Sequence, residues 1–217
     1  TGSPVAPPAA VVFDLGNVLI GWDPLPAVAA GVGTDEALRF LSADDFDFMA
    51  WNHHQDAGRD WAQAEAEVAE RFPHWHRHAC AYRAHFAASL TGALEDHVAV
   101  LRDLHAAGVP VYALTNWSAE LFPVARRRFD FLALFDDIVV SGQERLAKPD
   151  PRVFSLLAAR VGHPLAECVF ADDSAANVAA ARAAGLDAVH VAAGTDLRAE
   201  LAARGLPVGA AQVRTAP

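Results

Sequence analysis

The hydrophobic residues of this chain follow two different patterns, and the first is a single continuous apolar run. Residues 10–20 are almost entirely apolar, with one carboxylate, Asp14, in the middle. A run of β-branched and aromatic residues of this kind predicts a strand buried on both faces, where a charge is costly. Gly16 and Asn17 predict a turn directly afterwards. Asp14 is therefore expected at the carboxyl end of a central strand, the edge at which open α/β sheets bind their ligands.

From residue 97 onward, apolar segments of strand length alternate with segments of helical period. The predicted strands are 109–115, 137–141, 168–171 and 188–191. The predicted helices run from 97 to Gly108, from Asn116 toward Phe129, over 151–161, and from a Ser174 cap to Gly185. This alternation predicts an α/β fold, a parallel sheet with helices on both faces.

Residues 21–95 interrupt this rhythm. Helices are predicted from Thr34, over 59–72 and over 74–88, and no strand is predicted, so the segment is interpreted as a helical insertion. The resulting domain division is an unstructured end at 1–10, a core at 11–20 and 96–217, and the insertion at 21–95. Residues 1–10 have no basic region and do not resemble a signal peptide.

Composition and charge narrow the classes of partner. The net charge of −10 disfavours nucleic acid and anionic membranes, and no apolar run reaches the length of about 18 residues that a membrane span needs. The two cysteines, Cys80 and Cys168, suggest no disulfide framework and favour a reducing cytoplasm. We expect a monomer or homodimer that acts on a small molecule.

The chain has one lysine, Lys148, among 17 basic residues. A single lysine in an arginine-rich chain indicates a site that needs a compact ammonium group. It falls beyond the predicted strand 137–141.

Polar residues gather at the carboxyl ends of the predicted strands: Asp14, Thr115–Asn116, Lys148 and Asp172–Asp173. Because these ends meet at one edge of a parallel sheet, three carboxylates are expected to lie together. A hard divalent cation relieves their repulsion, and oxygen ligands favour Mg²⁺. Thr115, the helix N-terminus predicted after it and Lys148 are expected to bind an anion. The set is typical of phosphoryl transfer.

These segments resemble the four motifs of the haloacid dehalogenase superfamily. They are, in order, Phe13–Leu19, Leu114–Asn116, Lys148–Asp150 and Phe170–Asn177. The resemblance implies a Rossmann-like core, and it implies that the helical insertion is a cap over the active site.

The resemblance also implies the roles of the site residues. Asp14 is the expected nucleophile, Thr115 and the N–H of Asn116 are expected to bind phosphoryl oxygens, and Lys148 is expected to neutralise developing charge. The family's substrate is then a small phosphorylated compound.

Mg²⁺ is the expected cofactor, bound by Asp14, Asp172 and the carbonyl of Gly16, with Asp173 holding it directly or through water. Gly16 and Asn17 are also expected beside the substrate.

One position departs from the family's phosphatases. They usually carry a second Asp two residues after the nucleophile, as general acid and base, where this chain has Gly16. Loss of such a group typically costs about 10²–10⁴-fold in rate. Three interpretations remain. The first is a phosphatase whose substrate has a good leaving group, such as a sugar phosphate, or whose proton donor comes from the cap or solvent. The second is a 2-haloacid dehalogenase, which needs no acid, and the third is a non-catalytic binding protein. The acidic pair Asp172–Asp173 favours the first.

Within the insertion, Trp51 and Arg59 bracket a stretch that is interpreted either as a lid contacting substrate or as a turn between helices. Asp23, just past the first motif, is a further candidate for the missing proton donor.

Overall fold

The computed structural model describes residues 6–209 of the chain and contains a five-stranded parallel sheet. Its strand order is β5-β4-β1-β6-β7. The strands are β1 (Ala10–Phe13), β4 (Val111–Thr115), β5 (Asp137–Val140), β6 (Cys168–Asp172) and β7 (Asp187–His190). The predicted parallel α/β sheet is confirmed, and its first strand is the central one.

Strand β1 is central because its residues are apolar on both sides. Val11 and Phe13 pack into one hydrophobic layer, and Ala10 and Val12 pack into the other. Since successive side chains of a strand point to opposite faces, an uninterrupted apolar run suits only a strand covered on both sides.

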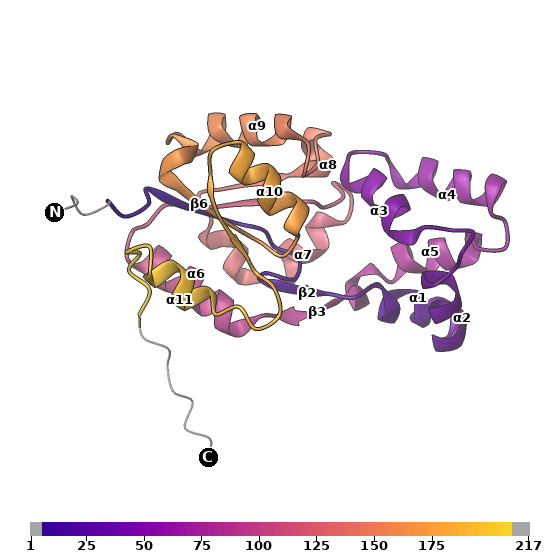
Figure 1. Cartoon of the computed structure of the whole chain (residues 1–217). Helices are drawn as coiled ribbons and strands as arrows, with labels where there is room; N and C mark the ends of the chain where they lie inside the picture. The colour runs from indigo at the N-terminus through magenta and orange to yellow at the C-terminus, as the bar shows by residue number, and fades with distance from the viewer. Residues whose placement is uncertain (1–5, 210–217) are drawn as a thin grey trace, which may run out of the picture.

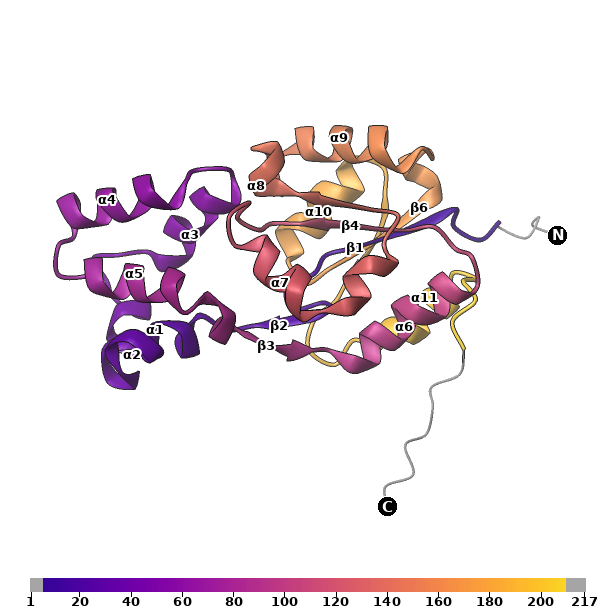
Figure 2. The ribbon, with the colours of Figure 1, turned by 180° about the vertical axis from the view of Figure 1, so that it is seen from behind.

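Helices cover both faces of the sheet (Figures 1 and 2). On one face lie α9 (Pro151–Val161) and α10 (Ala175–Ala183), with α8 (Ser141–Glu144) at the end of β5. On the other face lie α6 (Glu95–Ala106), α7 (Phe122–Arg128) and α11 (Leu197–Ala202). Short 3₁₀ turns occupy Phe86–Ser89, Asp130–Leu134 and Leu165–Glu167.

A group of five helices stands beside the sheet, beyond the carboxyl ends of its strands (Figure 1). These are α1 (Pro24–Val32), α2 (Thr34–Leu41), α3 (Phe48–Asp56), α4 (Trp61–Arg71) and α5 (His76–Ala84), called the helical unit below. The sequence predicts α2, α4 and most of α5 but not α1 or α3. Each of the two missed helices begins after an aspartate cap, Asp23 and Asp47 respectively.

The prediction that residues 21–95 contain no strand is wrong. Strands β2 (Ile20–Trp22) and β3 (Leu90–Ala93) pair antiparallel and connect the helical unit to the core. They are short, and Gly21 lies opposite Gly92. Because glycine has no side chain to pack, the sequence shows no apolar alternation here.

A second correction concerns the segment after β4. The predicted helix from Asn116 begins only at Phe122, because the intervening residues bind other parts of the core. The N–H of Trp117 donates to Ser141 Oγ (2.9 Å), and the carbonyl of Trp117 accepts from the N–H of Gly142 (3.0 Å). No helix N-terminus follows Thr115, so that part of the predicted anion site is wrong.

At the N-terminus, residues 1–5 of the predicted unstructured end lie outside the described residues. Ala10 already belongs to β1, and the N–H of Ala9 donates to the carbonyl of Glu167 (2.7 Å). Within 6–209, no helix has the length and apolar character to cross a lipid bilayer.

Candidate active site

Three carboxylates meet at the carboxyl edge of the sheet. Asp14 follows β1, Asp172 ends β6, and Asp173 comes next. Strands β1 and β6 are neighbours, and Phe13 lies opposite Ala171. The residues next in sequence, Asp14 and Asp172, are therefore brought close together. One oxygen from each of the three lies within 4.8 Å of the others.

Lys148 lies among these carboxylates with only 1% of its surface exposed. Its Nζ donates to Asp172 Oδ2 (2.6 Å) and to the carbonyl of Leu114 (2.8 Å), and it lies 3.1 Å from Asp14 Oδ1. The ammonium thus bridges the expected nucleophile and the expected metal ligand.

The electrostatics of this group are dominated by burial. Burial raises the pKa of Asp14 to about 7, against the attraction of Lys148, and the nearby Asp172 and Asp173 raise it further. Burial opposes the charge on Lys148, but the attraction of Asp14 and Asp172 outweighs it and raises the lysine pKa. One ammonium therefore serves three carboxylates, and the excess negative charge suits a divalent cation.

Thr115 ends β4 beside this group and is buried, yet its hydroxyl has no hydrogen-bond partner within the described part of the chain. Buried polar groups without partners are rare and costly. The hydroxyl is therefore available to a bound ligand, as expected for a group that binds a phosphoryl oxygen.

The side chain of Asn116 has a positioning role that the sequence did not reveal. Its Nδ2 donates to the carbonyl of Lys148, and its Oδ1 accepts from the N–H of Lys148, both at 2.8 Å. This two-way amide contact fixes the main chain from which the lysine side chain extends. The role predicted for Asn116 uses its main-chain N–H, so the two are compatible.

Asn177, in the first turn of α10, orients Asp172. Its Nδ2 lies 3.1 and 3.2 Å from the two carboxylate oxygens. Asn17 has a left-handed backbone (φ 55°), its Oδ1 accepts from the N–H of Trp22 (3.0 Å), and its side chain also hydrogen-bonds Asp173. Asn17 is thus placed at the acidic group.

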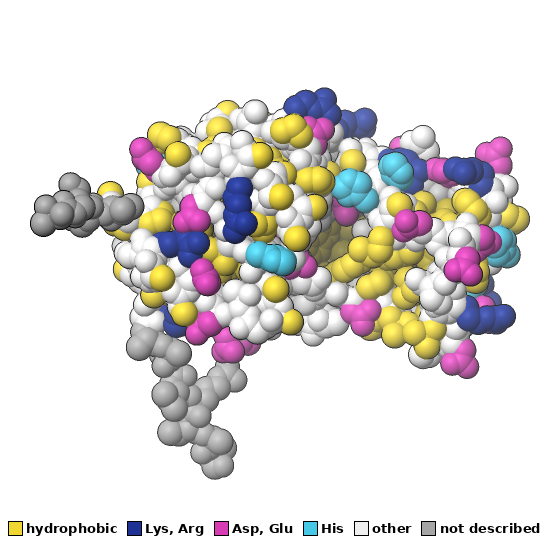
Figure 3. All heavy atoms as spheres, viewed as in Figure 1, with side chains coloured by type: hydrophobic (Ala, Val, Ile, Leu, Met, Phe, Trp, Pro, Cys, Tyr) yellow, Lys and Arg dark blue, Asp and Glu magenta, His cyan; other side chains and the backbone are white. Residues whose placement is uncertain are grey.

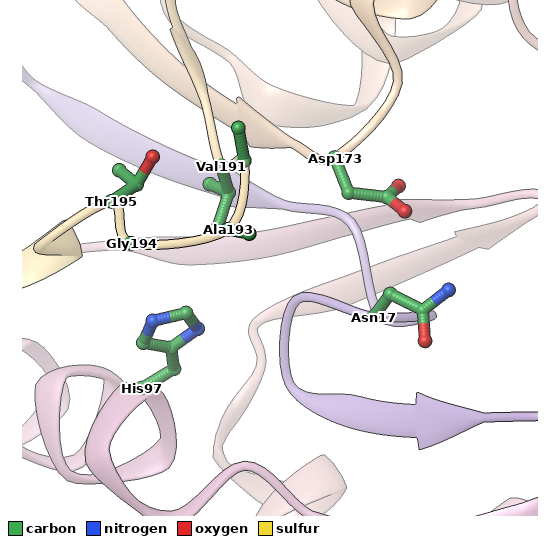
Figure 4. Close-up of a pocket in the computed structure, with 8 residues that line it drawn as sticks. Asn17, His97, Asp173, Val191, Ala193, Gly194 and Thr195 are labelled. Atoms are coloured by element: carbon green, nitrogen blue, oxygen red, sulfur yellow. The ribbon is translucent and has the colours of Figure 1, made fainter.

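Beside Asp173 the surface is hollowed, forming a cavity of about 420 Å³ (Figure 4). Asn17, His97 and the segment Val191–Thr195 line its other sides. Burial raises the pKa of Asp173, and the adjacent Asp172 adds to this. The hollow leaves Asp173 accessible from solvent.

Trp51 and Arg59 lie elsewhere. Trp51 is buried in the helical unit against Trp61, with ring centroids 5.4 Å apart. The guanidinium of Arg59 is held by Glu67, by Gln55 Oε1 (2.7 Å) and by the carbonyl of Trp51 (3.3 Å). These contacts stabilise the helical unit itself, so the structure does not bring the two side chains to the acidic group.

The donor set fits Mg²⁺. Asp14, Asp172 and Asp173 offer only oxygen, and no histidine or cysteine joins them in the metal-ligand groups found within the described residues. Hard oxygen ligands suit Mg²⁺ and not zinc.

Gly142 allows α8 to approach the loop after β4. A Cβ at this position would lie 2.7 Å from the carbonyl oxygen of Trp117, which is main chain and cannot rotate away. We expect Gly142→Ala to lower the free energy of unfolding by about 1–3 kcal/mol and to lower activity, because the displaced loop begins at Asn116, directly after Thr115 at the end of β4. Chemical denaturation measures the first effect, and an unchanged midpoint would contradict this account of the close approach.

Comparison with known proteins identifies the family of this chain. The sequence model of the haloacid dehalogenase-like hydrolases matches residues 8–185. The chain belongs to this family. It is therefore a hydrolase, and two of its curated relatives are phosphatases.

Among those relatives is sesquiterpene phosphatase astK of Aspergillus oryzae, 29% identical over 192 residues, covering 84% of this chain and 89% of the relative. Phosphatase MT3486 of Mycobacterium tuberculosis is 40% identical over 94 residues, 42% of each chain. Among solved structures, the HAD family enzyme BT-2542 of Bacteroides thetaiotaomicron has a TM-score of 0.68 at 21% identity, covering 88% of this chain and 97% of its own. This structure supports the fold.

Proposed function

We propose that this hydrolase is a Mg²⁺-dependent phosphatase that cleaves a small phosphomonoester through a phosphoaspartate on Asp14. The observation that carries the proposal is the position of Lys148 Nζ, in contact with both Asp14 and Asp172. On the neighbouring strand β4, the hydroxyl of Thr115 has no hydrogen-bond partner within residues 6–209. A carboxylate, an ammonium and a hydroxyl thus come from one edge of the sheet, which supports their use as nucleophile, cation and donor.

Each residue of the site has a defined role in the proposed reaction. Asp14 attacks phosphorus, while the ammonium of Lys148 and the hydroxyl of Thr115 bind phosphoryl oxygens and stabilise their charge. Asn116 and Asn177 hold Lys148 and Asp172 in place. Asp14, Asp172, Asp173 and the carbonyl of Gly16 would hold Mg²⁺, which when bound supplies further charge neutralisation at the phosphoryl group. Water then hydrolyses the phosphoaspartate.

The leaving group of the substrate extends toward the helical unit. Figure 3 shows a hollow between the core and this unit in which hydrophobic side chains predominate. The relative from Aspergillus oryzae is a sesquiterpene phosphatase, an enzyme of apolar substrates by its name. A phosphorylated apolar alcohol therefore belongs in the substrate panel beside the sugar phosphates that the sequence favours.

Phosphate release from aryl, alkyl and sugar phosphates tests this function. We expect release that needs added Mg²⁺ and falls at least tenfold with a chelator such as EDTA, and is restored by excess Mg²⁺, because the three carboxylates repel one another without a cation. Release that is indifferent to both chelator and metal would contradict the metal assignment while leaving the hydrolase assignment intact.

A 2-haloacid dehalogenase is the second candidate, and one observation favours it. Gly16 supplies no acid, and a halide leaves without a proton. However, Asp172 and Asp173 place two further negative charges beside the nucleophile, and the anionic carboxylate of a haloacid would enter against them. Halide release from 2-chloropropionate in the absence of metal would support this candidate over the phosphatase.

Three further statements remain predictions from the sequence: a reducing cytoplasmic location, a monomeric or dimeric state, and the absence of a nucleic-acid partner. Cys80 and Cys168 are both unpaired thiols, consistent with the first of them.

A further inference from the structure

The first two residues of α8 bind both main-chain hydrogen-bonding groups of Trp117. The N–H of Trp117 donates to Ser141 Oγ (2.9 Å), and its carbonyl accepts from the N–H of Gly142 (3.0 Å). The strand register explains this meeting, because Thr115 lies opposite Val140 and the two segments continue side by side beyond these residues. Only the contact of Ser141 uses a side chain. A substitution at Ser141 therefore removes one of the two contacts without altering a main-chain atom.

The hydroxyl of Ser141 is oriented by the helical unit. Its oxygen lies 2.5 Å from the main-chain carbonyl oxygen of Asp56, the last residue of α3, and 3.5 Å from the carbonyl oxygen of Trp117. A hydroxyl has one proton to donate, and the shorter contact receives it. The lone pairs of Oγ then remain to accept from the N–H of Trp117. Ser141 is fully buried, so both bonds are shielded from water.

Trp117 directly follows Asn116, the residue that fixes the main chain of Lys148. The side chain of Asn116 donates to the carbonyl of Lys148 and accepts from its N–H, both at 2.8 Å. Lys148 Nζ in turn lies 3.1 Å from Asp14 Oδ1. A continuous series of contacts and covalent bonds therefore leads from the hydroxyl of Ser141 to the proposed nucleophile.

The helical unit also binds this loop farther from Asn116. Trp61, the first residue of α4, donates from Nε1 to Ser118 Oγ (2.8 Å) and from its N–H to Glu120 Oε1 (2.9 Å). These contacts attach the later part of the loop, residues 118–120. The side chain that holds the residue directly after Asn116 is that of Ser141.

Removing the hydroxyl of Ser141 deprives two main-chain groups of this partner, the N–H of Trp117 and the carbonyl of Asp56. Trp117 is only 6% exposed, so water does not readily replace the hydroxyl. A buried donor without a partner is costly, and the main chain is expected to move to satisfy it. Movement at Trp117 shifts Asn116 and, with it, the ammonium of Lys148.

We propose that Ser141 is a positioning residue of the active site. Its hydroxyl holds the loop at Trp117 and so, through Asn116, sets the position of the Lys148 ammonium. The inference rests on the proposed phosphatase function. Because Lys148 stabilises charge that develops as Asp14 attacks, misplacing it is expected to weaken binding of the transition state more than binding of the substrate.

The test compares Ser141→Ala with the wild type by turnover and by inhibition. Vanadate adopts the five-coordinate geometry of phosphoryl transfer, so its inhibition constant reports binding of the transition state, and that of inorganic phosphate reports binding of the ground state. We expect kcat to fall by about 10–100-fold, as for other residues that orient catalytic groups. The vanadate inhibition constant is expected to rise by a similar factor and the phosphate constant by only a few-fold.

An inhibition constant does not depend on how much of the enzyme is folded. A purely structural role of Ser141 therefore lowers turnover per total protein but leaves the vanadate constant at the wild-type value. Ser89→Ala is the matched control, because Ser89 is also fully buried and its Oγ also donates to a main-chain carbonyl, that of Phe86 (2.7 Å). It is expected to lower the melting temperature about as much as Ser141→Ala and to leave the vanadate constant unchanged.

Ser141→Cys separates volume from hydrogen bonding. The thiol fills the space of the hydroxyl but is a weak donor and a weak acceptor. We therefore expect Ser141→Cys to lose nearly as much activity as Ser141→Ala.

The double variant Ser141→Ala with Asn116→Ala tests the route. If Ser141 acts through Asn116, the double variant loses little more activity than Asn116→Ala alone. Independent effects multiply instead.

A wild-type vanadate constant in Ser141→Ala, full activity in Ser141→Cys, or multiplied losses in the double variant would overturn this inference and leave the proposed function standing. A wild type that releases phosphate from no ester would overturn the proposed function and this inference with it.

Discussion

Asp14→Asn is expected to abolish phosphate release, lowering kcat by a factor on the order of 10⁴ to 10⁶, as loss of a nucleophile does in other covalent enzymes. The amide is a poor nucleophile and forms no phosphoaspartate. The fold is expected to survive. In the wild type the N–H of Leu15 donates to Asp14 Oδ1 (2.7 Å), and the asparagine oxygen of the variant can accept the same hydrogen bond. The substitution also removes a negative charge that Asp172 and Asp173 repel.

The measurement is a single-turnover and steady-state assay with thermal unfolding in parallel. We expect no covalent phosphoenzyme in the variant and a melting temperature equal to or above that of the wild type. Asp44→Asn, at an exposed acid of the helical unit, is the control and is expected to behave as the wild type. Phosphate release at more than a few per cent of the wild-type rate would remove Asp14 from the role of nucleophile.

The sequence predicted the core well because its periodicities coincide with burial. Strand β1 is covered on both faces, so its apolar run marked it without ambiguity, and the turn at Gly16 and Asn17 placed Asp14 at the sheet edge. The rule that parallel strands end at the same edge predicted the meeting of Asp14, Lys148 and Asp172, and the contacts of Lys148 confirm it.

The wrong predictions have a common cause: tertiary contacts, and not the local sequence, determine the structure at these positions. Strands β2 and β3 pair through two glycines that leave no hydrophobic signal. The segment after Thr115 follows its bonds to Ser141 and Gly142 instead of forming a helix. Arg59 carries a charge suited to a phosphate, but Glu67 and Gln55 already bind it.

Lys148→Arg is expected to lower activity by at least about 10²-fold, comparable to the loss of a single charge-stabilising donor, although the charge is conserved. The ammonium fits a closed space: its Nζ contacts Asp14, Asp172 and the carbonyl of Leu114, and it lies 5.3 Å from the centre of the Phe170 ring. A guanidinium is broader and planar and has no room there without displacing a carboxylate. Overpacking of this kind is expected to cost about 1–3 kcal/mol of the free energy of unfolding.

Lys148→Met separates charge from size, because it fills a similar volume without a proton to donate. It leaves Asp14 and Asp172 buried without their cation, a change that costs about 3–5 kcal/mol when one partner of a buried pair is removed. Arg152→Lys, an exposed exchange nearby on α9, is the control and is expected to change neither stability nor rate. If Lys148→Arg instead turned over at near the wild-type rate, the requirement for a compact ammonium would be wrong, and the single lysine of the chain would need a different explanation.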